Sequence, residues 1–149
     1  MSTPTILRVS HADILEAENA AQLIAEYAAE CSVPDANPQA EQYAALEQAG
    51  ALQCFGAYVD GTLIGFASVL TAIMPHHGKR VATVESIFVQ AQSRTTDAAL
   101  FLLSALEQYA AERDCVAMLS TARAGSQYDK LLQRRYNQTP SHSLYTRWL

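Results

Sequence analysis

The residue of this sequence best suited to moving a proton is a carboxylate in an otherwise apolar segment. Glu85 is the single charged residue of segment 84–89, Val-Glu-Ser-Ile-Phe-Val, whose composition is typical of a β-strand. A carboxylate in such surroundings is a candidate general base. Because side chains alternate along a strand, Glu85 lies on the opposite face from Val84, so a solvent-facing glutamate would give the same pattern.

Two adjacent histidines form a second candidate site. His76 and His77 stand between Pro75 and Gly78, in a segment that breaks the chain between two apolar runs. Histidine titrates near neutral pH, so the pair could contact a substrate or relay a proton, although a solvated loop has the same composition. No carboxylate or cysteine stands at a useful spacing from them, and we predict no metal site.

Composition and charge narrow the classes of protein to which the chain could belong. Its 149 residues are 50% hydrophobic and 17% charged, which is typical of a folded domain. The net charge of −5 argues against a protein that binds nucleic acid or anionic membranes. No apolar run approaches the roughly 18 residues of a membrane span. We therefore expect neither a nucleic-acid nor a membrane partner.

The cysteines and the N-terminal residues indicate a compartment. Cys31, Cys54 and Cys115 are widely spaced and form no C-x-x-C pair, which is typical of buried small side chains in a reducing environment. Residues 1–5 have neither the basic nor the apolar region of a secretory signal. We expect a cytoplasmic protein that is a monomer or a homodimer.

Hydrophobic periodicity predicts the elements that position these residues. It indicates strands over 5–9, 51–59, 62–73, 80–89, 115–120 and 143–149, and helices over 13–31, 38–49, 97–113 and 125–135. Asp60-Gly61 predicts a hairpin turn. The apolar run 115–120 is typical of a strand buried on both faces and parallel to 80–89. The sequence thus predicts one α/β (α+β) domain over 1–149, with a mixed, mostly antiparallel central sheet and helices on both faces.

This order of elements, and segment 84–136 in particular, resembles the GNAT superfamily of N-acetyltransferases. In that family a strand like 84–89 precedes an acetyl-coenzyme A signature, Arg or Gln followed by x-x-Gly-x-Gly/Ala, which falls here on 94–99. The resemblance implies that this loop holds the pyrophosphate of acetyl-CoA and that the strand end holds its pantetheine arm. The implied cofactor-binding residues are Ile87, Phe88, Val89, Arg94, Thr95, Thr96, Asp97, Ala98 and Ala99.

Arg94 and Ala99 fit the signature, whereas Asp97 replaces its central glycine. The family's loop wraps an anion with backbone N–H groups at a helix N-terminus, where glycine permits close approach. Asp97 adds bulk and negative charge there, but an acidic residue also suits the first turn of any helix. Thr95 and Thr96 could donate to phosphate or cap the helix.

The resemblance also implies catalytic roles. Glu85 corresponds to a glutamate that acts as general base in many members, often through a water, because a protonated amine must lose a proton before it attacks a thioester. The family's Tyr-x-x-x-Gly-Phe/Tyr segment aligns with 131–136, which places Leu131 at the general acid and Arg135 at the glycine. Tyr128 shares that helical face and could supply the acid, or could be a core aromatic.

We therefore predict an N-acetyltransferase that moves an acetyl group from acetyl-CoA to a primary amine of a small-molecule or peptide acceptor, with His76 and His77 in contact with that acceptor. The alternative is a catalytically inactive GNAT-fold binding or assembly module, because positions 97, 131 and 135 all depart from the family's pattern. Segment 143–149, with its exposed strand edge, could then form a dimer contact.

Overall fold

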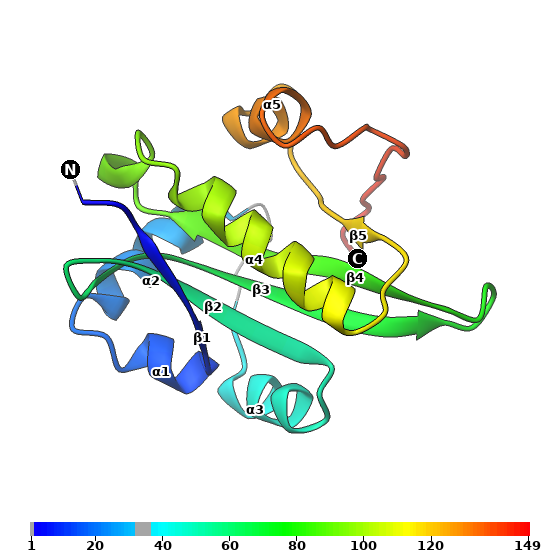
Figure 1. Ribbon diagram of the computed structural model, residues 1–149, viewed down its shortest axis with the longest axis horizontal. Helices are drawn as coiled ribbons and strands as arrows, with labels where there is room; N and C mark the ends of the chain where they lie inside the picture. The colour runs from blue at the N-terminus through cyan, green and yellow to red at the C-terminus, as the bar shows by residue number, and fades with distance from the viewer. Residues whose placement is uncertain (1, 32–36) are drawn as a thin grey trace.

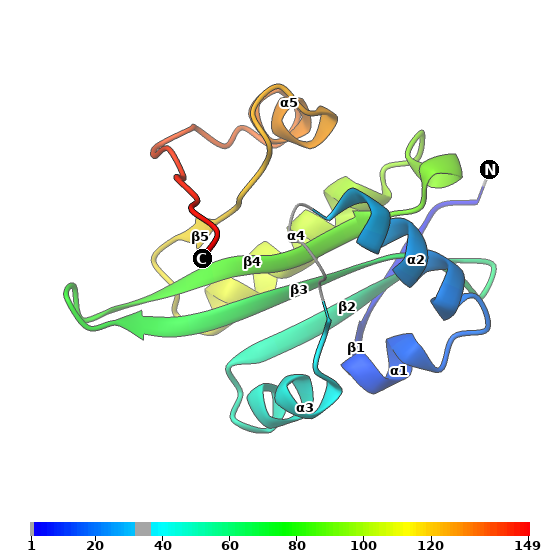
Figure 2. The ribbon, with the colours of Figure 1, turned by 180° about the vertical axis from the view of Figure 1, so that it is seen from behind.

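A computed structural model describes residues 2–31 and 37–149, which form a sheet between helices (Figures 1 and 2). The strands are β1 (Thr5–Val9), β2 (Leu52–Val59), β3 (Thr62–Met74), β4 (Lys79–Val89) and β5 (Met118–Leu119). The helices are α1 (His11–Leu15), α2 (Ala20–Glu30), α3 (Ala40–Gln48), α4 (Ala98–Glu112) and α5 (Gln127–Arg134), with a 3-10 turn at Ala91–Ser93. None of the described helices is both long and apolar enough to cross a bilayer.

The five strands lie in the order β1-β2-β3-β4-β5. Each of the first three strands pairs antiparallel with the next, and β5 pairs parallel with β4. The turn between β2 and β3 has positive φ at both Asp60 (49°) and Gly61 (79°), the geometry whose twist matches that of a hairpin. These observations confirm the predicted hairpin, the parallel pairing and the mixed, mostly antiparallel sheet.

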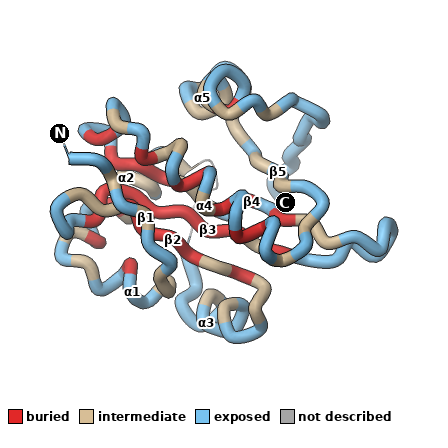
Figure 3. The backbone as a smooth tube through the Cα atoms, viewed as in Figure 1, coloured by how far each residue is buried: buried red, intermediate tan, exposed pale blue. Residues whose placement is uncertain are grey.

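An apolar cluster covers each face of the sheet. On one face, Leu102 and Leu106 of α4 are fully buried against strand residues that include Val69. On the other face, Leu23 of α2 packs with Phe66 and with residues of α1. The buried stretch therefore runs through the central strands and α4, as Figure 3 shows. Helices on both faces confirm the predicted layering.

The helix predicted over 13–31 is wrong, because the chain forms two helices there. Ser10 and Asp13 make a capping box that starts α1, with Ser10 N donating to the Asp13 carboxylate at 2.8 Å. Asn19 then donates its side-chain amide to the carbonyl oxygen of Leu63 at 2.7 Å, and α2 begins at the next residue. A contact with a distant strand thus fixes a break that helical periodicity does not reveal. The helix predicted over 38–49 begins at Ala40.

Two predicted strands differ in the structure: the one over 115–120 is shorter, and the one over 143–149 is wrong. Of the run 115–120, only Met118 and Leu119 form a strand, opposite Ala82 and Thr83, although Val116 and Ala117 also make backbone hydrogen bonds to β4. Leu119 is 48% exposed, so this strand is not buried on both faces. Segment 143–149 has no strand structure and is exposed. Because pairing with β5 ends at Thr83, residues 84–89 of β4 have no strand partner on that side among the described residues, and this opening positions the site.

Candidate active site

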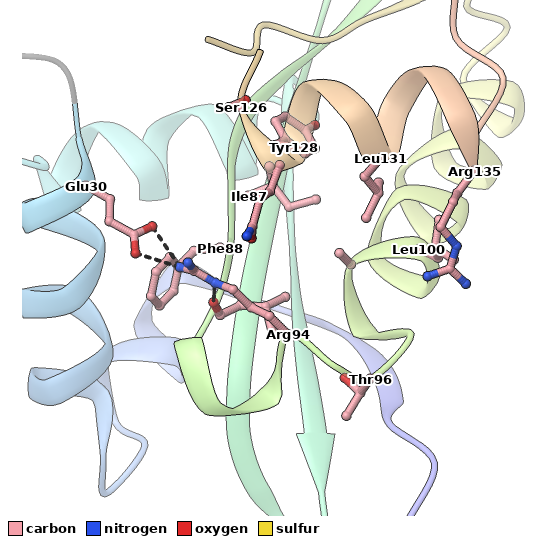
Figure 4. A pocket seen from close by; sticks show the side chains of 13 residues that line it. Glu30, Ile87, Phe88, Arg94, Thr96, Leu100, Ser126, Tyr128, Leu131 and Arg135 are labelled. Carbon is pink, nitrogen blue, oxygen red and sulfur yellow. Dashed lines mark hydrogen bonds and ion pairs between the residues drawn. The ribbon is translucent and has the colours of Figure 1, made fainter. Parts of the chain in front are cut away.

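A cavity of about 510 Å³ lies where β4 and β5 separate. It is bounded by the end of β4, the start of α4 and one face of α5, with the last residue of α2 at its edge (Figure 4). We call it the β4–α5 cavity. Its lining residues are Glu30, Ile87, Phe88, Val89, Arg94, Thr96, Ala99, Leu100, Ser126, Gln127, Tyr128, Leu131 and Arg135.

Six of the nine residues predicted to bind the cofactor line this cavity: Ile87, Phe88, Val89, Arg94, Thr96 and Ala99. The other three do not line it. Thr95 is exposed, Ala98 is fully buried in the core, and the Asp97 side chain points to α5. Thr96 donates its hydroxyl to the Ser93 carbonyl at 2.6 Å and accepts from the backbone N–H of Ala98 at 3.3 Å, which is a helix-capping role.

Arg94 is fixed on three sides. Its Nε donates to the carbonyl oxygen of Val89 at 2.8 Å, and its Nη2 lies 2.7 Å from both carboxylate oxygens of Glu30. The guanidinium carbon is 5.5 Å from the centre of the Phe88 ring, which is within cation–π range. Arg94 therefore ties the loop after β4 to α2 and to the strand itself.

Asp97 does not need the backbone freedom of glycine. It is the N-cap of α4 with φ −86° and ψ 16°, which any residue can adopt. Its carboxylate pairs with Arg135 Nη2 at 2.9 Å, so the negative charge placed in the loop is offset by a cation from α5. Asp97 and Arg135 occupy the two positions where the resembled motifs have glycine, and they contact each other.

Tyr128 points into the β4–α5 cavity from the first turn of α5, above Ile87 (Figure 4). Its hydroxyl oxygen is buried and has no hydrogen-bond partner among the described residues. Burial raises the pKa of Tyr128 to about 12. The phenol therefore keeps its proton at neutral pH, and Tyr128 lines the cavity while its buried hydroxyl lies near that of Ser120.

Glu85 is the extra residue of a β-bulge in β4. Val84 pairs with Val69 and Ser86 pairs with Ser68, so Glu85 has no direct partner on β3. A bulge of this kind directs two successive side chains to similar sides of the sheet. Ser68 Oγ lies 2.8 Å from Ser86 Oγ and also donates to the Glu85 carboxylate, which confirms that both face α1–α3.

Tyr43 of α3 completes the environment of the carboxylate. Its hydroxyl lies 2.9 and 3.0 Å from the two oxygens of Glu85. Burial, together with the neighbouring Glu85 charge, raises the pKa of Tyr43, so its phenol stays protonated and donates. His11 stacks on the Tyr43 ring at 4.0 Å with nearly parallel planes. Partial burial lowers the pKa of His11 below its usual value, so the imidazole is neutral at neutral pH.

A second cavity, of about 200 Å³, lies on this face, and we call it the His11 cavity. Its walls are mostly apolar, with hydroxyls of Ser68, Ser86 and Tyr43 at one side. Its lining residues are His11, Ile14, Leu15, Ile24, Tyr27, Pro38, Ala40, Tyr43, Cys54, Phe66, Ala67, Ser68 and Ser86. Ser86 lines the His11 cavity and Ile87 lines the β4–α5 cavity, so the bulge at Glu85 adjoins both.

His76 and His77 lie elsewhere. They form the exposed tip of the β3–β4 hairpin, which projects away from the helices (Figure 2). At about 3.3 Å per residue, the stretch of β4 from Lys79 to Glu85 spans about 20 Å. The two histidines line neither cavity, so the geometry does not support their predicted contact with the acceptor.

The sequence analysis missed Tyr43, Ser68, His11 and Glu30 as site residues. No local motif marks them, because each reaches the site from a different element. The sequence did carry a signal for a different contact of the site, the ion pair between Arg135 and Asp97. Arg135 stands where the resembled motif has glycine, and a cation there suggests an anionic neighbour.

Known proteins share the fold on which this site lies. Residues 20–149 match the model of the acetyltransferase (GNAT) family. A search of curated proteins returned no match. Among solved structures, the chain is similar to ribosomal-protein-alanine N-acetyltransferase from Brucella melitensis biovar Abortus 2308, at 25% identity over 97% of this chain and 99% of that one, with a TM-score of 0.72.

Two further structures show the same fold. Glucosamine-6-phosphate N-acetyltransferase from Arabidopsis thaliana is 10% identical, covers 99% of both chains and has a TM-score of 0.76. AAC(6')-Iy, solved in complex with the bisubstrate analogue CoA-S-monomethyl-acetylneamine, is 20% identical over 99% of both chains, also with a TM-score of 0.76. The match in fold therefore spans nearly the whole length of each chain.

Proposed function

The chain belongs to the GNAT acetyltransferase family, and we propose that it transfers an acetyl group from acetyl-CoA to a primary amine. The observation that carries this proposal is that two cavities flank the bulge of β4, one lined by Ile87 and the other by Ser86. One has an unpaired strand edge and a protonated phenol, and the other adjoins a carboxylate held by two hydroxyl donors.

The residues of the β4–α5 cavity fit coenzyme A. The edge of β4 at 87–89 has no strand partner on this side in the described part of the chain, and apart from the Val89 carbonyl, which accepts from Arg94, it offers backbone groups that an extended amide chain such as pantetheine can pair with. The start of α4 and the guanidinium of Arg135 lie at one side, where a phosphate is favoured by the helix dipole and by charge. The buried hydroxyl of Tyr128 supplies the polar partner that a sulfur atom in the cavity would need.

Acetyl-CoA supplies the thioester carbon that the amine attacks. Glu85 takes the proton that the ammonium group must lose, directly or through a water, and two hydroxyl donors hold its carboxylate in place. As the nitrogen–carbon bond forms and the carbon–sulfur bond breaks, Tyr128 gives its proton to the departing thiolate. The proton on Glu85 returns to solvent, and the second proton that the nitrogen loses on becoming an amide restores Tyr128, so the cycle balances.

The His11 cavity is the place for the part of the acceptor next to its amine. Its apolar walls favour a compact apolar group, and the neutral ring of His11 adds no positive charge to repel a cationic amine. A ribosomal-protein-alanine N-acetyltransferase is among the similar structures, so peptides that begin with alanine belong in the first acceptor panel.

Calorimetric titration with acetyl-CoA, followed by a thiol-release assay against an amine panel, tests the proposal. We expect wild type to bind acetyl-CoA, and Glu85→Gln to bind it equally but to lose turnover by about 10²-fold or more. Glu18→Gln, which removes the same charge from an exposed turn, is the matched control. Absence of acetyl-CoA binding at millimolar ligand would overturn the proposal and favour a binding or assembly module.

A further inference from the structure

We infer that Arg135 is the cation that binds the pyrophosphate of coenzyme A, and that Asp97 is the partner it leaves when it does so. This inference rests on the proposed function, and it assigns a ligand contact to a residue outside the loop signature. It also gives a role to the two residues that replace glycine in the resembled motifs.

Arg94, the other cation of the β4–α5 cavity, is not free to take this role. Its guanidinium is engaged by Val89, by both oxygens of Glu30 and by the face of Phe88. Its side chain is 36% exposed, against 57% for Arg135. Turning the Arg94 guanidinium toward a phosphate would break the hydrogen bonds from its Nε and Nη2, so we assign Arg94 to positioning the loop.

Within residues 2–31 and 37–149, the Arg135 side chain pairs with one group, the Asp97 carboxylate at 2.9 Å. Both side chains are more than half exposed, and ion pairs at such exposure add little to stability, so the pair opens at small cost. A pyrophosphate offers the guanidinium more charge and a bidentate geometry, both of which a single carboxylate oxygen lacks. The exchange of partners is therefore favourable for Arg135.

Asp97 is equally free to release its partner. It is the N-cap of α4, yet its side chain makes no capping hydrogen bond, so the helix does not hold the carboxylate in place. The carboxylate occupies the region where the 15-residue helix α4 favours an anion. Figure 4 shows Arg135 beside Leu100 of the first turns of α4, while Arg94 lies toward Phe88. Arg135 therefore lies at the helix end where a phosphate is favoured.

The test is calorimetric titration of coenzyme A into wild type, Arg135→Gln, Asp97→Asn and the double variant. Arg134→Gln is the matched control, because it removes the same charge from the adjacent exposed residue, which does not line the cavity. We expect Arg135→Gln to weaken binding about 10-fold, as the loss of a charged hydrogen bond would, and Asp97→Asn to tighten it about 3-fold. The double variant should bind better than Arg135→Gln, because the unpaired carboxylate is then gone.

Ligand fragments distinguish the phosphate that is contacted. The loss caused by Arg135→Gln should persist with dephospho-coenzyme A, which keeps the pyrophosphate, and should vanish with pantetheine, which has no phosphate. If the loss vanishes with dephospho-coenzyme A, or if Arg135→Gln equals Arg134→Gln, the inference is wrong while the proposed function stands. If wild type itself does not bind coenzyme A, both fail.

Discussion

Replacing Tyr128 with phenylalanine should change stability and activity in opposite directions. The hydroxyl of Tyr128 is buried without a hydrogen-bond partner among the described residues, so the folded protein bears the cost of its desolvation. Phenylalanine fills the same space without the polar atom. The same hydroxyl is the proposed proton donor to the thiolate, so the variant loses a catalytic group and gains stability.

The magnitudes follow from general costs of buried polar groups. A buried unsatisfied hydroxyl costs about 1–3 kcal/mol, so we expect Tyr128→Phe to raise the free energy of unfolding by about 1 kcal/mol. For a chain of this size, that gain corresponds to a rise of about 2–4 °C in Tm. Loss of the general acid should lower kcat by about 10²-fold or more, while the affinity for coenzyme A stays near that of wild type.

Tyr136→Phe is the matched control, because it removes a phenolic hydroxyl from the same part of the fold. The Tyr136 hydroxyl lies 3.1 Å from the Leu103 carbonyl oxygen, donates to the Glu107 carboxylate, and does not line the cavity. Its loss should lower stability by about 1 kcal/mol and leave kcat unchanged. Urea unfolding and a thiol-release assay on the two variants give all four numbers.

Alkaline pH supplies an independent check on Tyr128. Its pKa is about 12 in the folded protein, against about 10 for an unburied tyrosine, so folding favours the protonated phenol. Below pH 10 the ionisation of Tyr128 does not change the free energy of unfolding. Between pH 10 and 12 the free energy of unfolding falls, because the unfolded chain releases the phenolic proton while the folded protein keeps it. Tyr128→Phe should flatten that fall. If it destabilises the protein, or keeps full kcat, the assignment of an unpartnered phenol acting as acid is refuted.

Three further predictions concern the scaffold of the site. A Cβ at Gly65 would lie 2.5 Å from the backbone oxygen of Phe88, so Gly65→Ala should destabilise the fold by about 1–3 kcal/mol and weaken coenzyme A binding. Chemical denaturation measures the first effect and calorimetric titration the second. The lowered pKa of His11 means that the folded protein favours the neutral imidazole, so His11 contributes a loss of stability as pH falls below 6.5. His11→Phe should abolish this contribution, and Tm measured against pH checks it. Leu106→Ala, at a fully buried position of α4, should cost about 2–5 kcal/mol in urea unfolding without changing KM in the remaining folded protein.

The elements that could be predicted are those set by residues close together in the sequence. Asp60-Gly61 fixes a two-residue turn through the φ values that these residues tolerate, and the flanking apolar runs then pair as neighbours. Long-range contacts decided the failures. The break between α1 and α2 depends on Asn19 meeting a carbonyl of β3, and an apolar run at 115–120 pairs over only two residues because the edge strand separates from the sheet.

The candidate site shows the same division. Glu85 could be proposed from the sequence because a lone carboxylate in an apolar strand is visible there. Tyr43, which holds it, stands 42 residues away, and no periodicity links the two. The sequence analysis predicted that Asp97 departs from the resembled loop, but the pairing of its carboxylate could not be predicted, because its partner Arg135 is 38 residues further on.

The bulge at Glu85 explains how one short strand serves two cavities. Strict alternation from Val84 would place that side chain on the same face as Phe88 and opposite to Val89. Instead Val84 and Val89 both pack in the cluster under α4, and Phe88 packs on the other face with α2, which requires one extra residue between them.

That extra residue is Glu85, and it comes two positions after Thr83, where pairing with β5 ends. A bulge bends and twists its strand, so the insertion that turns the carboxylate toward the His11 cavity also turns the end of β4 away from β5. The proposed base and the opening for coenzyme A are thus two results of the same inserted residue.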